Sequence, residues 1–319
     1  MEIDKSDKTI LTQLEYNARI KEKELAKLCH LSKDAIRYRI RKLKAQNFIL
    51  GHSCFVDYTK LGRTSYKLYL KTQGSEKDWA KLRFFLDEKP AIFARFESQS
   101  DWNFGLAYFA KTLNEFYLFE RDLFSEFGHI IQSSELCHMV DASVFESRAL
   151  LNSKTKSFPL FGEVVSTPVD DTDIKLLEIL LKDSSGSLLS ISENIKLSPD
   201  ATKKRIQRLE REQVIRRYTS SINYQKLGFE TYKVFIWVKE YTEDVEKRLL
   251  LQLHNYTNTR NIIRMVGPWK LEVEFICKNY DELSNIMKDL RVSFPDSITS
   301  INYAIFRGET YYPSKKIPA

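Results

Sequence analysis

The sequence predicts an α+β protein built from two tandem copies of one unit, in which a helical part is followed by a part that mixes strands and helices. The first observation is an internal repeat, because Leu31-Ser32 recurs as Leu197-Ser198 and Lys60-Leu61-Gly62 as Lys226-Leu227-Gly228. The second is apolar spacing typical of helices at the start of each copy. The third is alternation typical of strands further along each copy. Identity at a constant register indicates a duplication.

The composition is that of a folded protein with a mild excess of positive charge. The chain has 319 residues, 43% of them hydrophobic, and a formal net charge of +7. At roughly 100–200 residues per domain, this length predicts two to four compact units. No stretch approaches the roughly 20 apolar residues of a membrane span, and the polar N-terminus is unlike a signal peptide. With four scattered cysteines, we expect a cytoplasmic protein with reduced thiols and no membrane partner.

The helical part of each copy is predicted to be a winged helix-turn-helix domain, spanning residues 1–62 and 169–228. Three short helices are expected in the first copy, and the third places Ile36, Ile40 and Leu43 inward at i, i+4 and i+7. Residues 49–58 are expected to form two short strands around Gly51, which make the wing.

The second part of each copy is predicted to be a ferredoxin-like domain, spanning residues 63–146 and 229–319. In both copies the strand and helix patterns follow the order β-α-β-β-α-β, which is typical of that fold. Between the copies, residues 147–168 carry prolines, a glycine and small polar residues, and they are predicted to be a linker. Phe158, Leu160 and Phe161 are expected to dock part of this linker.

Three stretches of the first copy are "IDKSDKTILTQL", "ELAKLCHLSKDAIRYRIRKL" and "VDYTKLG", with the counterparts "VDDTDIKLLEIL", "LSPDATKKRIQRLEREQVIRRY" and "INYQKLG" in the second. They resemble the Lrp/AsnC family, the feast/famine transcription regulators. The resemblance implies a regulator of transcription that binds double-stranded DNA. Family members usually carry one copy per chain and dimerise through the ferredoxin-like domain. Here it therefore implies pairing of both such domains within one chain, with a further homo-oligomer left open.

The resemblance also implies a small-molecule effector, because the ferredoxin-like domain of many members binds one, such as an amino acid. The family's usual turn between the second and third strands is glycine, any residue, aromatic, aspartate. This chain has "SDWN" at Ser100–Asn103 and "GPWK" at Gly267–Lys270. It keeps the glycine once and the aspartate in neither copy, so we assign no effector-binding residues.

A basic face on the third helix of each copy is the candidate DNA contact. Lys33–Lys44 holds six basic residues and one acid, a local charge of +5, whereas a merely solvated helix face usually mixes signs. Arginines on such a helix suit base edges in a major groove, and lysines suit phosphates. The predicted DNA-binding residues are Lys33, Arg37, Tyr38, Arg41, Lys42 and Lys44 in the first copy and Lys203, Lys204, Gln207, Arg208, Arg211, Arg216 and Arg217 in the second.

Arg39 and Arg205 occupy the same position of the repeat, and the sequence leaves two roles open for them. One role is a salt bridge to the first helix of the domain, through Asp7 and Asp173. The other role is a contact with a DNA phosphate.

The two basic helices differ in the side chains that they would present to DNA. The first carries arginines where the second carries lysine and glutamine, and the second also contains more acids. Different side chains do not read identical half-sites equally well, so the sequence predicts an asymmetric operator.

Residues outside these helices predict neither a catalytic site nor a metal site, and no cofactor is expected. Cys29, for example, matches Ile195 of the second copy, which indicates a core thiol rather than a metal ligand. We therefore expect no enzyme. Two alternatives stay open: an enzyme like the sirohaem decarboxylases, which reuse this fold, and a non-specific architectural DNA-binding protein. A cavity lined by His129, His138 and Arg95 would favour the enzyme.

Overall fold

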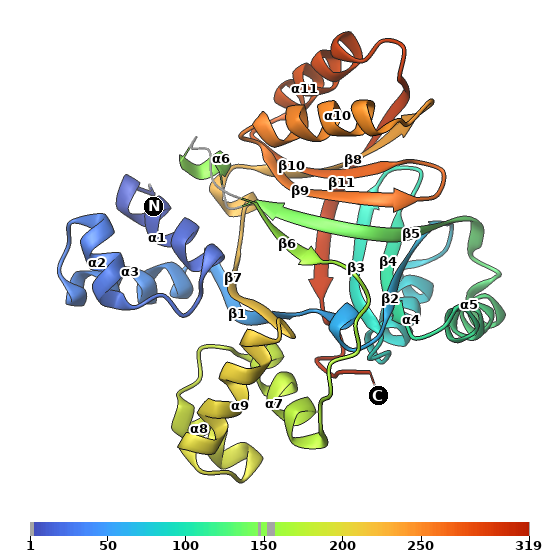
Figure 1. Ribbon diagram of the computed structural model, residues 1–319. Helices are drawn as coiled ribbons and strands as arrows, with labels where there is room; N and C mark the ends of the chain where they lie inside the picture. The colour runs from blue at the N-terminus through green and yellow to red at the C-terminus, as the bar shows by residue number, and fades with distance from the viewer. Residues whose placement is uncertain (1–2, 146–147, 152–156, 319) are drawn as a thin grey trace.

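Two helical heads, joined by a two-stranded ribbon, are attached to one side of a closed β-structure (Figure 1). The computed structural model describes residues 3–145, 148–151 and 157–318. The helices of the heads are α1 (Lys5–Tyr16), α2 (Glu22–Cys29) and α3 (Lys33–Ala45) in the first head, and α7 (Asp171–Lys182), α8 (Leu188–Ile195) and α9 (Pro199–Arg211) in the second.

Each head buries one face of its three helices around a small apolar core. In the first head, Leu11 of α1, Leu25 of α2 and Ile36 of α3 are fully buried in one cluster. Of the other residues predicted to face inward, Leu43 is fully buried and Ile40 is half-buried against the same cluster. The predicted helix-turn-helix domain is therefore confirmed, both in its three helices and in the residues that the third helix turns towards the core.

The ribbon between the heads corrects the prediction of two short strands within each head. Each head contributes one strand, β1 (Ile49–Val56) or β7 (Ile215–Ile222), and these two strands pair antiparallel with each other. Gly51, expected at a turn, lies instead at a shift of register within β1. Apolar alternation shows that a strand buries one face, but it does not identify the partner strand, so the sequence could not show that the wing is shared.

The remaining strands confirm the β-α-β-β-α-β order in both copies. In the first copy they are β2 (Thr64–Thr72), β3 (Ile92–Gln99), β4 (Phe104–Ala110) and β5 (Ile131–Phe145), with helices α4 (Glu76–Asp87) and α5 (Leu113–Phe127). In the second they are β8 (Glu230–Val238), β9 (Thr259–Val266), β10 (Leu271–Cys277) and β11 (Ile298–Tyr311), with helices α10 (Glu243–Asn255) and α11 (Tyr280–Ser293). We call β2–β5 the first half-barrel and β8–β11 the second half-barrel.

The two half-barrels join at both edges into one ring of strands. β3 pairs with β11, β5 pairs with β9, and β2 pairs with β5, so the order β2-β4-β3-β11-β8-β10-β9-β5 returns to its start. The helices of each copy cover the outside of their own half-barrel (Figure 1). The interior holds a dense aromatic cluster in which Tyr69, Phe235 and Trp269 lie edge to face or tilted. No helix of the described residues has the length and apolar character needed to cross a membrane.

The segment between the copies is partly ordered. A short helix, α6 (Arg148–Leu151), and a strand, β6 (Ser157–Phe161), lie within it, and β6 pairs with the end of β5. Leu160 and Phe161 are buried and Phe158 is half-buried against the central core, so docking at these three positions is observed. Residues 147 and 152–156 of the predicted linker lie outside the described residues.

The C-terminal segment ties the barrel to the ribbon. The fully buried Tyr312 follows β11, and its hydroxyl donates to the carbonyl oxygen of Val56 at 2.9 Å. The amide of Val56 donates back to the same hydroxyl at 2.8 Å. The ribbon end is thus fixed to the last strand of the barrel. Two short 3₁₀ turns, Tyr58–Lys60 and Gln225–Leu227, lead from the ribbon towards β2 and β8.

We predict that His52 makes the stability of the ribbon depend on pH. Its Nδ1 lies 2.8 Å from the Ser220 hydroxyl across the ribbon, and burial lowers its pKa. Because the unfolded chain then binds a proton more readily than the native one, the free energy of unfolding falls as the pH drops below about 6.5. His52→Gln keeps a polar partner for Ser220 but does not titrate. Urea unfolding at a series of pH values should show a smaller acid-side loss in this variant, and parallel curves would contradict the assignment.

Candidate nucleic-acid interface

The third helix of the first head presents one face to solvent and one to the core. Ser32 caps α3, because its Oγ accepts from the amide of Ala35 at 3.2 Å. The side opposite the buried apolar residues carries most of the predicted DNA-binding residues. The exposed ones are Lys33, Arg37, Tyr38, Arg41 and Lys44, and Lys42 is half-buried.

Two arginines of α3 differ in how firmly they are held. Arg37 is about half exposed, and its Nε donates to Glu22 of α2 at 2.7 Å while its Nη1 lies 3.3 Å from Asp34. Arg41 is exposed, and its Nε makes a long 3.4 Å bond to the Arg37 carbonyl oxygen. Arg37 is therefore positioned by acids, whereas Arg41 is held weakly. The sequence alone did not identify Glu22 as a partner of Arg37, because Glu22 lies on another helix, α2.

The third helix of the second head has the same exposed face with different side chains. Ser198 caps α9 and Pro199 occupies its first turn, where the missing amide hydrogen removes no hydrogen bond. Thr202, Ile206 and Leu209 are buried. The predicted residues that are exposed on this helix are Lys203, Lys204, Gln207 and Arg211.

An arginine brace holds the third helix to the first in both heads. Arg39 Nη1 lies 2.8 Å from Asp4 and 2.7 Å from Asp7. Its counterpart Arg205 lies 2.8 Å from Asp170 and 2.9 Å from Asp173. The backbone amide of Asp7 and the nearby arginine lower the pKa of Asp4, which keeps that carboxylate charged. Of the two roles left open by the sequence, the salt bridge is the one observed.

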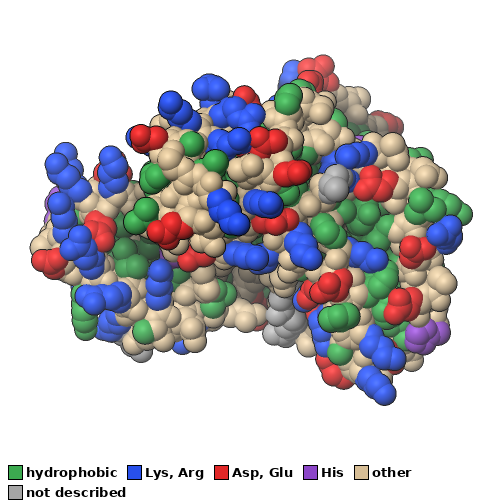
Figure 2. Space-filling model, turned by 90° about the horizontal axis from the view of Figure 1, so that it is seen from below, with side chains coloured by type: hydrophobic (Ala, Val, Ile, Leu, Met, Phe, Trp, Pro, Cys, Tyr) green, Lys and Arg blue, Asp and Glu red, His purple; other side chains and the backbone are tan. Residues whose placement is uncertain are grey.

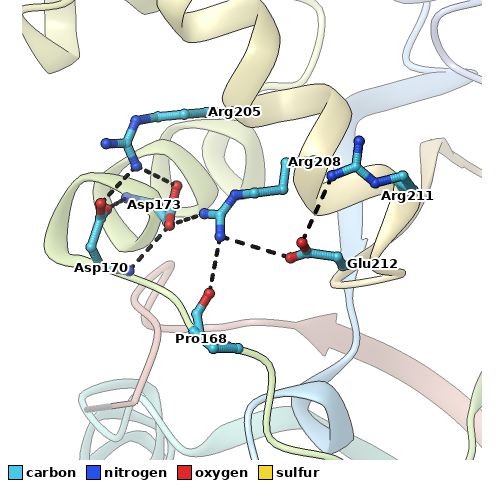
Figure 3. A network of polar contacts seen from close by, with 7 residues as sticks. All are labelled: Pro168, Asp170, Asp173, Arg205, Arg208, Arg211 and Glu212. Carbon is cyan, nitrogen blue, oxygen red and sulfur yellow. Dashed lines mark hydrogen bonds and ion pairs between the residues drawn. The ribbon is translucent and has the colours of Figure 1, made fainter.

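Arg208 belongs to the brace of the second head rather than to its open face. Figure 3 shows its guanidinium turned towards α7, where it binds Asp173 and donates to the carbonyl oxygen of Pro168 at 3.1 Å. Glu212 lies 3.8 Å away. The sequence placed Arg208 on the DNA-facing side. The structure instead uses it to satisfy Asp173, which is almost completely buried.

Arg216 and Arg217 lie on the wing strand β7, but their side chains contact other parts of the protein. Arg216 bonds the fully buried Asp57 of the first copy through Nε at 2.8 Å and Nη2 at 2.5 Å. Arg217 donates to the backbone carbonyl of Glu15 and stacks over the ring of Phe158, 4.0 Å from its centroid. Arg216 thus connects the two strands of the ribbon at one end, and Arg217 connects β7 to the first head and to the linker.

Basic side chains are spread over the face of the molecule that carries the heads, and one group of them covers the first head (Figure 2). Figure 2, which views the molecule from below, shows Lys and Arg side chains clustered at the left, over the first head. Over the middle of this face, acidic side chains lie between the basic ones. This distribution agrees with a more one-sided charge on α3 than on α9.

A cavity of about 230 Å³ lies between the ribbon and the barrel. Its polar lining includes Glu15, Arg260, Asn261 and Glu309. Burial raises the pKa of Glu15, whose carboxylate accepts from the Tyr224 hydroxyl at 2.6 Å. The Oδ1 of Asn261 is buried without a hydrogen-bond partner among the described residues. The cavity is small and has both polar and apolar walls, because Phe55, Val144 and Leu160 also line it, which suits a small ligand or water.

The histidines and arginine that would favour an enzyme do not converge on this cavity. Arg95 binds Asp87 of α4 on the outer face of the barrel, with Nη2 and Oδ2 3.0 Å apart. His138 Nε2 lies 2.7 Å from the Thr64 hydroxyl, and His129 is exposed. Within the described residues, His, Cys, Asp and Glu form no cluster of three that could hold a metal ion.

Two helix-turn-helix heads with exposed basic third helices define a DNA-binding protein. The AsnC-type helix-turn-helix domain matches residues 3–44 and again residues 169–210. The HTH-type transcriptional regulator FL11 of Pyrococcus furiosus is 31% identical over 123 residues, which cover 37% of this chain and 78% of that regulator. FL11 of Pyrococcus horikoshii is 30% identical over 132 residues, which cover 40% of this chain and 83% of that regulator. The chain belongs to the Lrp/AsnC family of transcriptional regulators.

A solved structure matches the whole two-copy arrangement. The crystal structure of the siroheme decarboxylase NirDL has a TM-score of 0.62 to this protein and 13% sequence identity, covering 99% of this chain and 93% of that one. At this identity the match shows the fold alone.

We predict that the protein is strongly destabilised when the Asp57–Arg216 pair loses one of its partners. Arg216→Leu leaves Asp57 buried without its cation, which should lower the free energy of unfolding by about 3–5 kcal/mol. The repeat supplies the control, because the positions matching Asp57 and Arg216 are Asn223 and Leu50. The double variant Asp57→Asn, Arg216→Leu should recover most of the loss in denaturant unfolding. A double variant no more stable than Arg216→Leu alone would contradict this role.

Proposed function

We propose that this regulator is sequence-specific and reads DNA with two non-identical helices, α3 and α9. The observation that carries the proposal is the exposed basic face of α3, opposite Ile36 and Leu43, repeated on α9 with other side chains. A major groove admits one helix, and arginine pairs bidentately with the acceptor edge of guanine. The remaining lysines suit phosphates, which position the protein without reading sequence.

Arg37 and Arg41 are the proposed base-reading residues of α3. Glu22 and Asp34 fix the direction of Arg37, which limits the rotamer freedom that it would lose on binding. The weak bond of Arg41 to a backbone carbonyl is easily exchanged for a base edge. At the matching positions α9 carries Lys203 and Gln207, and glutamine suits adenine rather than guanine.

We further propose that one chain supplies both recognition helices, which family members obtain by pairing two chains. A two-fold dimer places two recognition helices on two half-sites. Here the antiparallel pairing of β1 with β7 and the β3–β11 and β5–β9 ladders support the same arrangement between the two copies of one chain. Further assembly of chains is compatible with this arrangement.

We propose no catalytic role. The decarboxylase that shares the fold supports an enzyme by analogy alone. In this chain Arg95 and His138 are bound to neighbouring side chains and do not line the cavity between ribbon and barrel. If an effector is sensed, that cavity is the proposed place, because a ligand there would touch both the ribbon and the barrel.

Selection of binding sites from random DNA should yield an asymmetric site. Arg41→Gln gives α3 the residue that α9 has at the matching position, so base preference should change in one half-site only, by about 1–3 kcal/mol of discrimination. Gln207→Arg is the matched control and should change the other half-site. A perfect palindrome that binds one chain per half-site would overturn the two-head proposal, and unchanged preference in Arg37→Ala and Arg41→Ala would overturn the base-reading assignment.

Binding should also depend strongly on salt. If two heads neutralise about six phosphates, the logarithm of affinity should fall with the logarithm of salt at a slope near −5, since each phosphate contributes about −0.9. Lys44→Glu, which installs the residue found at the matching Glu210, should make the slope shallower. Fluorescence anisotropy across a salt series measures this slope, and a value shallower than about −2 for the unmodified protein would contradict placement of both heads on DNA.

A further inference from the structure

We infer that the two half-barrels are built to pair with each other and not with copies of themselves, because buried charges, seam charges and side-chain size are complementary only in the mixed pair. This inference rests on the proposed pairing of the two copies and adds a rule for choosing the partner. The partner surface of the first half-barrel is the second half-barrel of the same sequence.

The first observation is an ion cluster inside the barrel. Lys67 of β2 and Lys233 of β8 each place Nζ 2.7 Å from Oε1 of Glu272 on β10. All three side chains are buried, and the Tyr69 hydroxyl of the first half-barrel also donates to Glu272. Glu309 of β11 lies 3.8 Å from Lys233. Burial would raise the pKa of Glu272, but the two ammonium groups outweigh it and lower the value to about 2.

The two half-barrels contribute unequally to this cluster. The lysines match each other in the repeat, but Glu272 matches Gly105 and Glu309 matches Ala142. The first half-barrel therefore supplies one lysine and no acid, whereas the second supplies one lysine and two acids. A pair made of two copies of the first half-barrel would bury two lysines without these carboxylates. A pair made of two copies of the second half-barrel would bury two surplus acids. Unpaired buried charges of either sign are strongly unfavourable, so only the mixed pair is balanced.

The second observation is the charge at the two seams. At the β5–β9 seam, Asp141 is opposite Arg264, and Arg264 Nε donates to Asp141 at 2.9 Å. At the β3–β11 seam, Glu97 is opposite Gly308. In the repeat, Glu97 matches Arg264 and Asp141 matches Gly308. Two first half-barrels would therefore place Asp141 opposite Glu97 at both seams, and like charges directly opposite each other destabilise paired strands.

The third observation is a close approach at the end of the β5–β9 seam. Gly267, which follows β9, packs against Cys137 of β5 so tightly that a Cβ at Gly267 would lie 2.7 Å from Sγ and 3.2 Å from Cα of Cys137. The matching residue of the first copy is Ser100. Two first half-barrels would place that serine against Cys137, where there is no room for its Cβ.

Cross-linking of the full-length chain tests the rule. In a Cys29→Ser background, which removes the half-buried thiol and leaves three buried ones, Asp141→Cys with Arg264→Cys marks the mixed seam. Asp141→Cys with Glu97→Cys marks the seam of two first half-barrels, and it is a strict control because it removes the repelling acids. Both proteins are refolded from denaturant at high concentration, where chains compete, and are treated with a short bismaleimide.

The expected result is cross-linking of position 141 to 264 as the main product and none of 141 to 97, as mapped by peptide mass spectrometry. Cross-linked dimers through 141 and 97, or no product from the 141–264 pair, overturn the inference. As a second measure, Asp141→Arg and Arg264→Asp should each lower the melting temperature by a few degrees. The combined variant should recover part of this loss, because Glu246, the other partner of Arg264, then faces an acid, and no recovery overturns the seam argument.

DNA binding by the same preparations separates this inference from the proposed function. Cross-linking through 141 and 264 without any DNA binding would contradict the proposed regulator and leave the pairing rule standing. Cross-linking through 141 and 97 with DNA binding intact would overturn the pairing rule alone.

Discussion

The joining of strand edges between the two half-barrels is the contact on which the rest of the molecule depends. A single ferredoxin-like sheet leaves two edges unpaired and one face uncovered by helices. The β3–β11 and β5–β9 ladders satisfy both edges and bring the inner faces together, so that Trp269 and Phe235 of one copy pack on Tyr69 of the other. Because β2 and β8 follow the ribbon in the chain, closure of the ring also fixes where the heads emerge.

The duplication has kept the internal support of the heads and changed their outer faces. The Arg39–Asp7 and Arg205–Asp173 distances are nearly the same, at 2.7 and 2.9 Å, because each arginine links a buried aspartate of the first helix to the third helix. The exposed faces of α3 and α9 carry no such constraint, because solvent tolerates any polar side chain there. Within the heads, the exposed faces of the third helices have therefore been free to diverge.

Joining two copies in one chain also permits contacts that occur only once. In a symmetric dimer every contact has a twin, so a pair such as Asp57–Arg216 would have to be favourable in both places. Here the twin position holds Asn223 and Leu50. The shared Glu272 in the barrel is a second example, since two lysines from different copies surround one carboxylate. Such single contacts give each copy a distinct role in the fold.

Local pattern in the sequence determined the two-copy organisation, the three helices of each head, the β-α-β-β-α-β order and the exposed basic face of α3. These follow from periodicity and repeat register, which are properties of neighbouring residues. Tertiary structure alone decided that the wing is one strand from each head, that Arg208, Arg216 and Arg217 bind partners within the protein, and that Glu22 positions Arg37. The reason is physical: a charged side chain is placed by the partner that it meets across the fold, and that partner lies as many as 202 residues away in the sequence, where no spacing rule applies.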